Sequence, residues 1–294
     1  MSFSIDIAFV QQFKANCITL CQQKGSRLRQ YVQLKENLVG KQTHFERLGA
    51  TDVVKRTTRH GDTPLVSSVH SRRRVTMNDY EWADLVDKQD DIRMLINPKS
   101  LYAVNAAYSM GRKMDSDILA AAVGNSVAVD SSDAGSNITL SKTVAAAFGG
   151  TTIGLTLAKV RNTKRQLDAA ECDTDGRVLT VNAQMLEEML GVTEVVSADY
   201  NSVKALVQGE LNTFVGFNWV RTELIPWQSE SGDIKYAVAF QGSGLGLAIG
   251  QDVVTRVDER ADKSYSTQVY LAMTFGAVRV EEEKVIGVYC DMSP

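Results

Sequence analysis

The sequence predicts a mixed α+β fold, with helices and antiparallel hairpins rather than a run of βαβ units. Apolar residues at helical spacing follow Asn97-Pro98, a capping residue with proline at the first helical position, and they continue to Gly124. Strand-like runs then dominate residues 213–289. With 294 residues, 44% of them hydrophobic, the chain can bury a sizeable core. We therefore expect one large domain or two intimately joined ones.

The first expected element is an N-terminal helix that Ser4 can cap and Gly25 closes. Its apolar stripe has helical period and comprises Ile5, Phe9, Phe13, Cys17, Leu20 and Cys21. The clearest helix, over residues 98–124, would form a rod about 40 Å long. Charged residues near its middle indicate a partly exposed spine: Arg112, Lys113, Asp115 and Asp117.

A long extended region separates these two helices. Residues 39–48 have weak strand character, residues 51–69 are polar, basic and poor in large apolar groups, and residues 74–86 return as a second extended arm. A loop of this length without its own core is unusual in a compact domain unless it acts outside that domain. A two-stranded arm is also only marginally stable alone. We therefore expect the arm to rest on a neighbouring molecule.

After a Ser/Asp/Gly-rich break at residues 125–137, helices and strands are mixed. The expected helices cover residues 153–170 and 183–190, with a helical turn at 202–207. The expected strands cover residues 177–181, 213–225, 236–240, 245–249, 267–275 and 278–289.

No motif indicates catalysis, a cofactor or a metal. The run Gly242-Ser-Gly-Leu-Gly-Leu-Ala lacks a small residue at Leu247 and no helix follows it, so tight strand packing explains it better than a dinucleotide site. All three histidines lie in the extended arm. The four cysteines, Cys17, Cys21, Cys172 and Cys290, have no CxxC spacing, which argues against a zinc site, and Cys17 and Cys21 are expected as two small buried hydrophobes of the first helix. We expect no enzyme.

Charge is distributed unevenly. Residues 1–75 carry 13 Lys/Arg against 5 Asp/Glu, and the rest carries 19 against 30. The basic residues of the arm could bind phosphates or an acidic neighbouring subunit, and we favour the subunit. These candidate contact residues are Lys55, Arg56, Arg59, Arg72, Arg73 and Arg74. No apolar run reaches the roughly 18–20 residues of a membrane span, and the N-terminus lacks a secretory signal pattern.

Three stretches carry a resemblance to a known family. They are LGATDVVKRTTRHGDTPLVSSVHSRRRVTMNDYEWADLVDKQDDIRMLINP, GFNWVRTELIP and AFQGSGLGLAIGQDVVTRVDERADKSYSTQVYLAMTFGAVRVEEEKVIGVYC. In this order they resemble the major capsid proteins of tailed double-stranded DNA bacteriophages, which have the Hong Kong 97-type fold. The resemblance implies an N-terminal arm at residues 1–37, an extended β-hairpin E-loop at 38–90, a peripheral domain at 91–150 and 267–294 with its spine helix at 98–124, and an axial domain at 151–266.

The resemblance also implies function and partners. The chain would self-assemble into hexamers and pentamers that form an icosahedral head around double-stranded DNA, bound without sequence specificity. A separate scaffolding protein is expected because no long helical scaffolding segment precedes the arm. A portal and, in some relatives, a cement protein would join it, with assembly in the host cytoplasm and a final place in the virion. The alternatives are an encapsulin-like compartment and a basic-armed nucleic-acid-binding protein.

Overall fold

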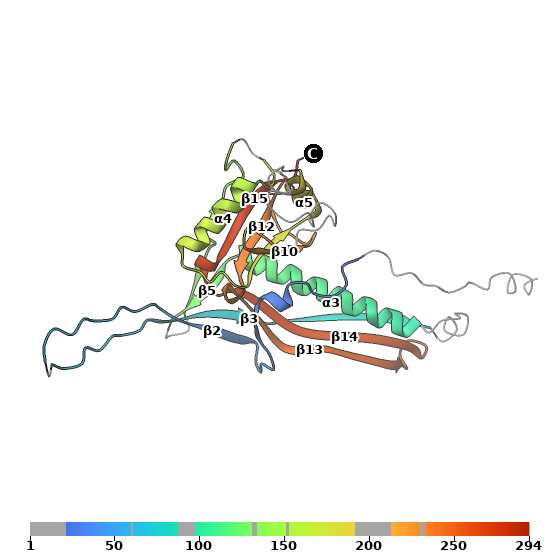
Figure 1. The fold of residues 1–294 in the computed structure, drawn as a ribbon. Helices are drawn as coiled ribbons and strands as arrows, with labels where there is room; N and C mark the ends of the chain where they lie inside the picture. Colours follow the sequence, from blue (N-terminus) through green and yellow to red (C-terminus); the bar gives the residue numbers. More distant parts are fainter. Residues whose placement is uncertain are drawn as a thin grey trace, which may run out of the picture. The chain divides into compact units, whose positions relative to one another are not determined.

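The computed structural model describes residues 22–59, 61–87, 98–130, 134–150, 153–191, 213–229 and 233–293 (Figure 1). The predicted N-terminal helix, apart from its end near Gly25, lies outside these residues, as do Asn97 and the helical turn at 202–207. The chain divides into a first unit of Met1–Ser26, Asp79–Arg112 and Asp252–Met273, and a second unit of Arg27–Asn78, Lys113–Gln251 and Thr274–Pro294. The four domain boundaries implied by the resemblance remain a prediction.

The first unit contains part of the long helix α3 (Pro98–Val123) and of the strands β4 (Asn78–Val86), β13 (Leu245–Arg260) and β14 (Ser266–Arg279). Strands β14 and β4 are neighbours in a sheet of order β1-β13-β14-β4, in which β1 is Gln33–Lys35. The Tyr270 hydroxyl donates to Glu81 Oε1 at 3.0 Å. The predicted spine helix is confirmed. Gly111 interrupts its side chains where residues 25–26 pass close by, since a Cβ there would lie 2.6 Å from Ser26 N.

Two predicted strand boundaries in this sheet are wrong. Strand β13 continues to Arg260, eleven residues beyond the predicted end, because the charged residues after Gly250 hide its strand character. Strand β14 runs through Gly276 without the predicted interruption. Gly276 is not a turn residue: a Cβ there would collide with the Thr76 carbonyl oxygen. The interruption comes later, at the 3-10 turn η3 (Glu282–Lys284).

The second unit contains a seven-stranded sheet of order β7-β15-β12-β8-β10-β9, with β11 beside β12. Its strands are β7 (Thr143–Val144), β8 (Arg177–Val181), β9 (Thr213–Phe214), β10 (Phe217–Arg221), β11 (Trp227–Ser229), β12 (Ile234–Gln241) and β15 (Val285–Asp291). Strands β8 and β10 are parallel, whereas β12 is antiparallel to both β8 and β15. The predicted single strand at 213–225 is wrong, because Val215 and Gly216 have φ values of 54° and 81° and form a turn.

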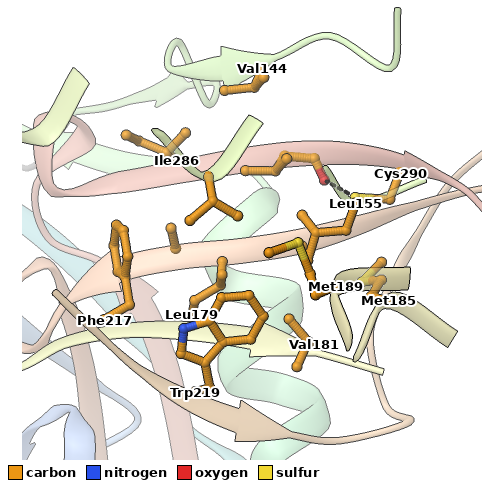
Figure 2. Packing of buried hydrophobic residues seen from close by; sticks show 14 of the residues in the cluster. Val144, Leu155, Leu179, Val181, Met185, Met189, Phe217, Trp219, Ile286 and Cys290 are labelled. Carbon is orange, nitrogen blue, oxygen red and sulfur yellow. Dashed lines mark hydrogen bonds between the residues drawn. The ribbon is translucent and has the colours of Figure 1, made fainter. Parts of the chain in front are cut away.

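Helices α4 (Leu157–Ala169) and α5 (Ala183–Leu190) pack on this sheet around a core that includes Leu179, Met185, Phe217, Trp219 and Ile286 (Figure 2). Strand β8 and helix α5 coincide with their predictions. Helix α4 begins four residues later than predicted. Its N-cap is Thr156, whose side chain accepts from the Lys159 N–H.

A third sheet has the order β2-β3-β5-β6, with β2 (Gln42–Leu48), β3 (His70–Thr76), β5 (Ser126–Val129) and β6 (Gly135–Ile138). The predicted break at 125–137 is therefore wrong in part: β5 and β6 form a short antiparallel hairpin, and β5 pairs with β3. A polar hairpin of this kind gives little period-2 signal because its side chains are small.

Candidate assembly arm

The hairpin of β2 and β3 forms the base of an arm, which we define as residues 42–76. The two strands pair in antiparallel register from Gln42 opposite Thr76 to Leu48 opposite His70. A last backbone hydrogen bond joins Gly49 N to Val69 O at 2.8 Å. Beyond it, residues 50–69 form the tip, whose described residues have no strand partner and are all exposed (Figure 1).

The tip exposes apolar side chains that a free surface would normally hide. Val53 and Leu65 are each 97% exposed. Val54, Val66 and Val69 are also exposed. Exposed apolar side chains within a polar segment are typical of a surface that binds another protein. Val53 and Leu65 in particular are almost free of contacts with the described part of the chain, so the tip has contact area available for another molecule.

The base of the arm, in contrast, is firmly packed. Phe45, Val75 and Met77 are buried in a cluster with Ala248, Val278 and Val280. Gly246 allows the Phe45 ring to lie directly on β13, because a Cβ there would be 2.7 Å from the ring carbon Cζ. The glycine-rich run is thus used for close packing, as the sequence predicts. Lys35 Nζ lies 4.8 Å from the ring centroid of Phe45 and adds a cation–π contact.

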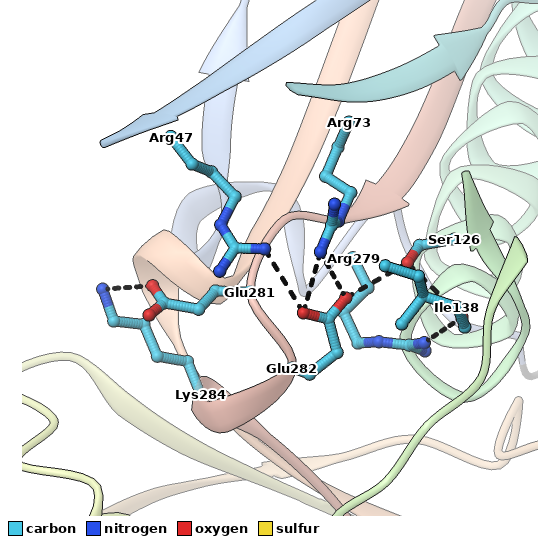
Figure 3. A network of polar contacts seen from close by, with 8 residues as sticks. All are labelled: Arg47, Arg73, Ser126, Ile138, Arg279, Glu281, Glu282 and Lys284. Carbon is cyan, nitrogen blue, oxygen red and sulfur yellow. Dashed lines mark hydrogen bonds and ion pairs between the residues drawn. The ribbon is translucent and has the colours of Figure 1, made fainter. Parts of the chain in front are cut away.

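One carboxylate of intermediate exposure, that of Glu282, ties the base together (Figure 3). Glu282, in η3, accepts from Arg73 Nη2 of β3 at 3.0 Å and from Arg47 Nη1 of β2 at 3.3 Å. The Ser126 hydroxyl of β5 donates to the same carboxylate at 3.3 Å. Burial acts to raise the pKa of Glu282, but the hydrogen bond from Arg73 and the charges of Arg73 and Arg47 outweigh it, so the pKa is lowered. Glu282 is therefore ionised and links three strands.

The buried side chain of Arg279 holds together elements around the base of the arm. Arg279 donates from Nη1 to Ala122 O at 2.8 Å and to Gly124 O at 2.6 Å. Its positive charge is therefore placed at the C-terminal end of α3, where the helix dipole is negative. Its Nη2 donates to Ile138 O of β6 at 2.8 Å. Burial lowers the pKa of Arg279. These contacts fix β6 and the end of α3 relative to β14.

Asp115 departs from the predicted exposed helix middle. It is fully buried and accepts from Arg27 N at 2.9 Å and Leu28 N at 3.1 Å. Its neighbour Asp117 behaves as predicted, with a partly exposed ion pair to Lys113 at 2.8 Å. Asp115 thus fastens the chain segment before β1 to the spine helix.

A family model described as phage capsid protein matches residues 5–292. The chain belongs to the phage capsid protein family. Its fold is similar to the capsid of Cyanophage P-SCSP1u, with a TM-score of 0.75 at 14% identity over 100% of this chain and 96% of that chain. A chain of Mycobacterium phage Che8 gives a TM-score of 0.65 at 14% identity, covering 95% and 97%. The capsid of a native GTA particle gives 0.67 at 12% identity, covering 96% of both chains.

A comparison with curated protein sequences finds no match. The predicted Hong Kong 97-type capsid fold is confirmed by the structural similarity over nearly the whole chain. In this capsid protein, no helix among the described residues is long and apolar enough to span a membrane. The described residues also contain no group of three or more His, Cys, Asp and Glu side chains that could hold a metal ion.

The structure separates the six basic contact candidates of this capsid protein. Lys55, Arg56 and Arg59 lie in the exposed tip. In β3, Arg72 is exposed and pairs with Glu46 at 3.9 Å, while Arg74 is half-buried beside Gly135. These five residues remain candidates.

Arg73 needs a correction. Its side chain is only 5% exposed and is engaged by Glu282 within its own chain. The sequence contains a signal for this: residues two apart in a strand share a face, so Arg73 shares the buried face of Val75. Sequence reasoning also missed Glu282, because nothing local distinguishes it from its neighbours Glu281 and Glu283.

Proposed function

We propose that this capsid protein self-assembles into hexamers and pentamers, which close an icosahedral head around double-stranded DNA. The observation that carries the proposal is the tip of the arm, which has no partner in the described part of its own chain and exposes Val53 and Leu65 almost completely. A sister subunit is the natural occupant, because every copy in a closed shell offers both an arm and the surface that receives one.

The split between a packed base and a free tip suits assembly. Each tip supplies a modest contact, and closure of the shell makes many such contacts cooperative. The basic residues Lys55, Arg56, Arg59, Arg72 and Arg74 would be attracted to a neighbour's acidic body, since residues 76–294 carry a net charge of −11. Opposite charges would also guide subunits into register during encounter.

The remaining expectations complete this proposal. The N-terminal arm, E-loop, peripheral domain and axial domain follow the boundaries implied by the resemblance. A separate scaffolding protein, a portal and a cement protein are the further partners, and the head assembles in the host cytoplasm. The chain acts as a structural subunit and not as an enzyme.

A shortened arm tests the role of the tip. Residues 50–68 are replaced with an Asn-Gly turn, which can close the hairpin because Gly49 and Val69 already face each other. The variant should fold, and circular dichroism should show the helix and strand content of the wild-type subunit. It should nevertheless form no stable shells in negative-stain electron microscopy. Normal particles from this variant would contradict the proposal.

A milder variant keeps the length of the tip. Val53→Ser with Leu65→Ser removes apolar contact area from side chains that touch nothing in their own chain, so unfolding stability should change by no more than about 0.5 kcal/mol. Shell yield should nevertheless fall. Unchanged assembly together with unchanged stability would show that the apolar tip is not a contact surface.

A further inference from the structure

Helix α4 has two chemically different faces. Val160, Thr163 and Leu167 are buried, together with Lys159, and the helix lies along β15 (Figure 1). Its solvent side carries Arg161 and Arg165, which are exposed, and Lys164, which is half-buried at the edge. We call Arg161, Lys164 and Arg165 the basic face.

The basic face has an unbalanced positive charge. Among the described residues, no carboxylate lies within ion-pair distance of any of its three side chains. Asp168 on the next turn could have served, but its Oδ1 accepts from Arg177 Nη1 at 2.6 Å. On most surfaces, basic residues at positions i, i+3 and i+4 are interspersed with acidic ones that relieve their repulsion. Here the three positive charges have no such acidic partner among the described residues and are available to an external anion.

The helix that carries this face is held rigidly. Lys159 Nζ donates to Ile153 O at 2.6 Å, Gly154 O at 2.8 Å and Tyr289 O at 2.9 Å, so it is fully used inside the chain. Glu188 of α5 accepts from Leu155 N at 2.6 Å in the segment that leads into α4. Three carbonyls and a carboxylate thus fix the start of the helix and hold the basic face in a set orientation.

We propose that the basic face of α4 binds the phosphate backbone of double-stranded DNA, the partner that the proposed shell function places inside the head. Residues three and four apart on a helix have Cβ atoms about 5–6 Å apart. Long Lys and Arg side chains at this spacing can reach successive phosphates of one strand, and the contact needs no base recognition. The inference depends on the proposed function only for the identity of the partner.

Two variants with equal charge change test this. The face variant combines Arg161→Gln, Lys164→Gln and Arg165→Gln, and the tip variant combines Lys55→Gln, Arg56→Gln and Arg59→Gln. Each removes three positive charges from exposed or half-buried side chains. Glutamine has nearly the helix propensity of arginine and lysine, so α4 should persist. Single Arg161→Gln and Arg165→Gln variants serve if the face variant unfolds.

The measurement is fluorescence anisotropy of a labelled 30-base-pair duplex with unassembled full-length subunits, across a salt series. The slope of log affinity against log salt is negative, and loss of three phosphate contacts makes it less steep by about 2.7. The wild-type affinity should therefore fall about 40-fold more than that of the face variant between about 50 and 200 mM salt. The tip variant should keep the wild-type slope.

The outcomes separate this inference from the proposed function. An unchanged slope for the face variant, an equal loss in both variants, or no duplex binding by the wild type at about 50 mM salt would overturn it. So would a face variant that keeps its slope but forms no shells, because the face would then be a subunit contact. If the wild type forms no shells while the slope difference holds, the shell proposal fails and the phosphate-binding face stands.

Discussion

Glu282→Ala removes the carboxylate that joins the strands at the base of the arm. The Arg73 side chain is 5% exposed and that of Glu282 is 14% exposed, so their ion pair is largely shielded from water. Removal of one partner of a buried pair costs about 3–5 kcal/mol, because the remaining charge stays desolvated and unpaired. Arg73 Nε already lacks a hydrogen-bond partner among the described residues, so loss of Glu282 would leave the guanidinium with still fewer hydrogen bonds. We expect a loss in unfolding free energy within that range.

The neighbouring Glu283 provides a matched control. Its side chain is 50% exposed and pairs with Lys142, 36% exposed, at 2.9 Å. Exposed pairs of this kind contribute about 0–1 kcal/mol, so Glu283→Ala should have little effect. The assay is urea unfolding of the unassembled subunit, with amide hydrogen exchange in β2 and β3 as the local readout, since a chain of two units need not unfold in one step. Equal effects of the two substitutions would refute the reasoning.

The stability that Glu282 contributes should decrease as the pH is lowered. Burial favours its neutral form, but the hydrogen bond from Arg73 and the two arginine charges prevail, and the folded pKa lies below the ordinary value of 4.5. The ion pairs therefore stabilise the folded state fully above about pH 4.5, and this stability is lost as the pH falls through the lowered pKa. Exchange protection in β3 should decline in that acidic range for the wild type, and Glu282→Ala should lack that part of the decline.

Two other predictions concern buried groups. Asp115→Ala leaves the buried Leu28 N–H without its acceptor and should cost about 1–3 kcal/mol of unfolding free energy. In the same urea titration, Asp117→Ala removes a partly exposed helix pair and should cost less, about 0.3–0.5 kcal/mol. Similar losses would show that Asp115 does not fasten the segment before Gln33 to the helix. Burial raises the pKa of Cys290 to about 12. This thiol should therefore resist iodoacetamide at pH 8 in the folded subunit and react in urea, as measured by peptide mass spectrometry. Rapid labelling of the folded protein would contradict its buried position.

The elements that the sequence predicts well are those with local signals. Helix α5 begins at an Asn182 cap, whose side chain accepts from Met185 N, and ends at Gly191. Strand β8 is a short apolar run between turn residues. The spine helix has a proline start and a sustained apolar period. Caps, turns and periodicity are properties of a few neighbouring residues, so they can be recognised without knowledge of the rest of the chain.

The errors arise where distant residues decide the structure. Gly276 was expected at a strand break, but it continues β14 because the backbone at Thr76, two hundred residues earlier, passes against it. Arg73 was predicted to contact another subunit like its basic neighbours, but its side chain is paired with Glu282 at the base of the arm. The exposed tip could be predicted because its polar and basic composition is a local property of the sequence. Its attachment could not, because Phe45 meets Gly246, and Arg73 meets Glu282, only in the folded chain.

The hydrogen bonds of Glu282 at the base of the arm matter because a small change in the direction of the arm moves its tip by a larger distance. A tip that advances about 10 residues from the base can extend some 30 Å at about 3.3 Å per residue, so a tilt of about 10° at the base would displace its end by about 5 Å. Packing around Phe45 resists separation but is weakly directional, whereas hydrogen bonds from Arg47, Arg73 and Ser126 to Glu282 fix both strands and β5 in angle. Contacts between protein surfaces tolerate much less than 5 Å of displacement. Loss of Glu282 should therefore impair shell assembly even under conditions where the subunit remains folded, because the tip would no longer meet its neighbour in register.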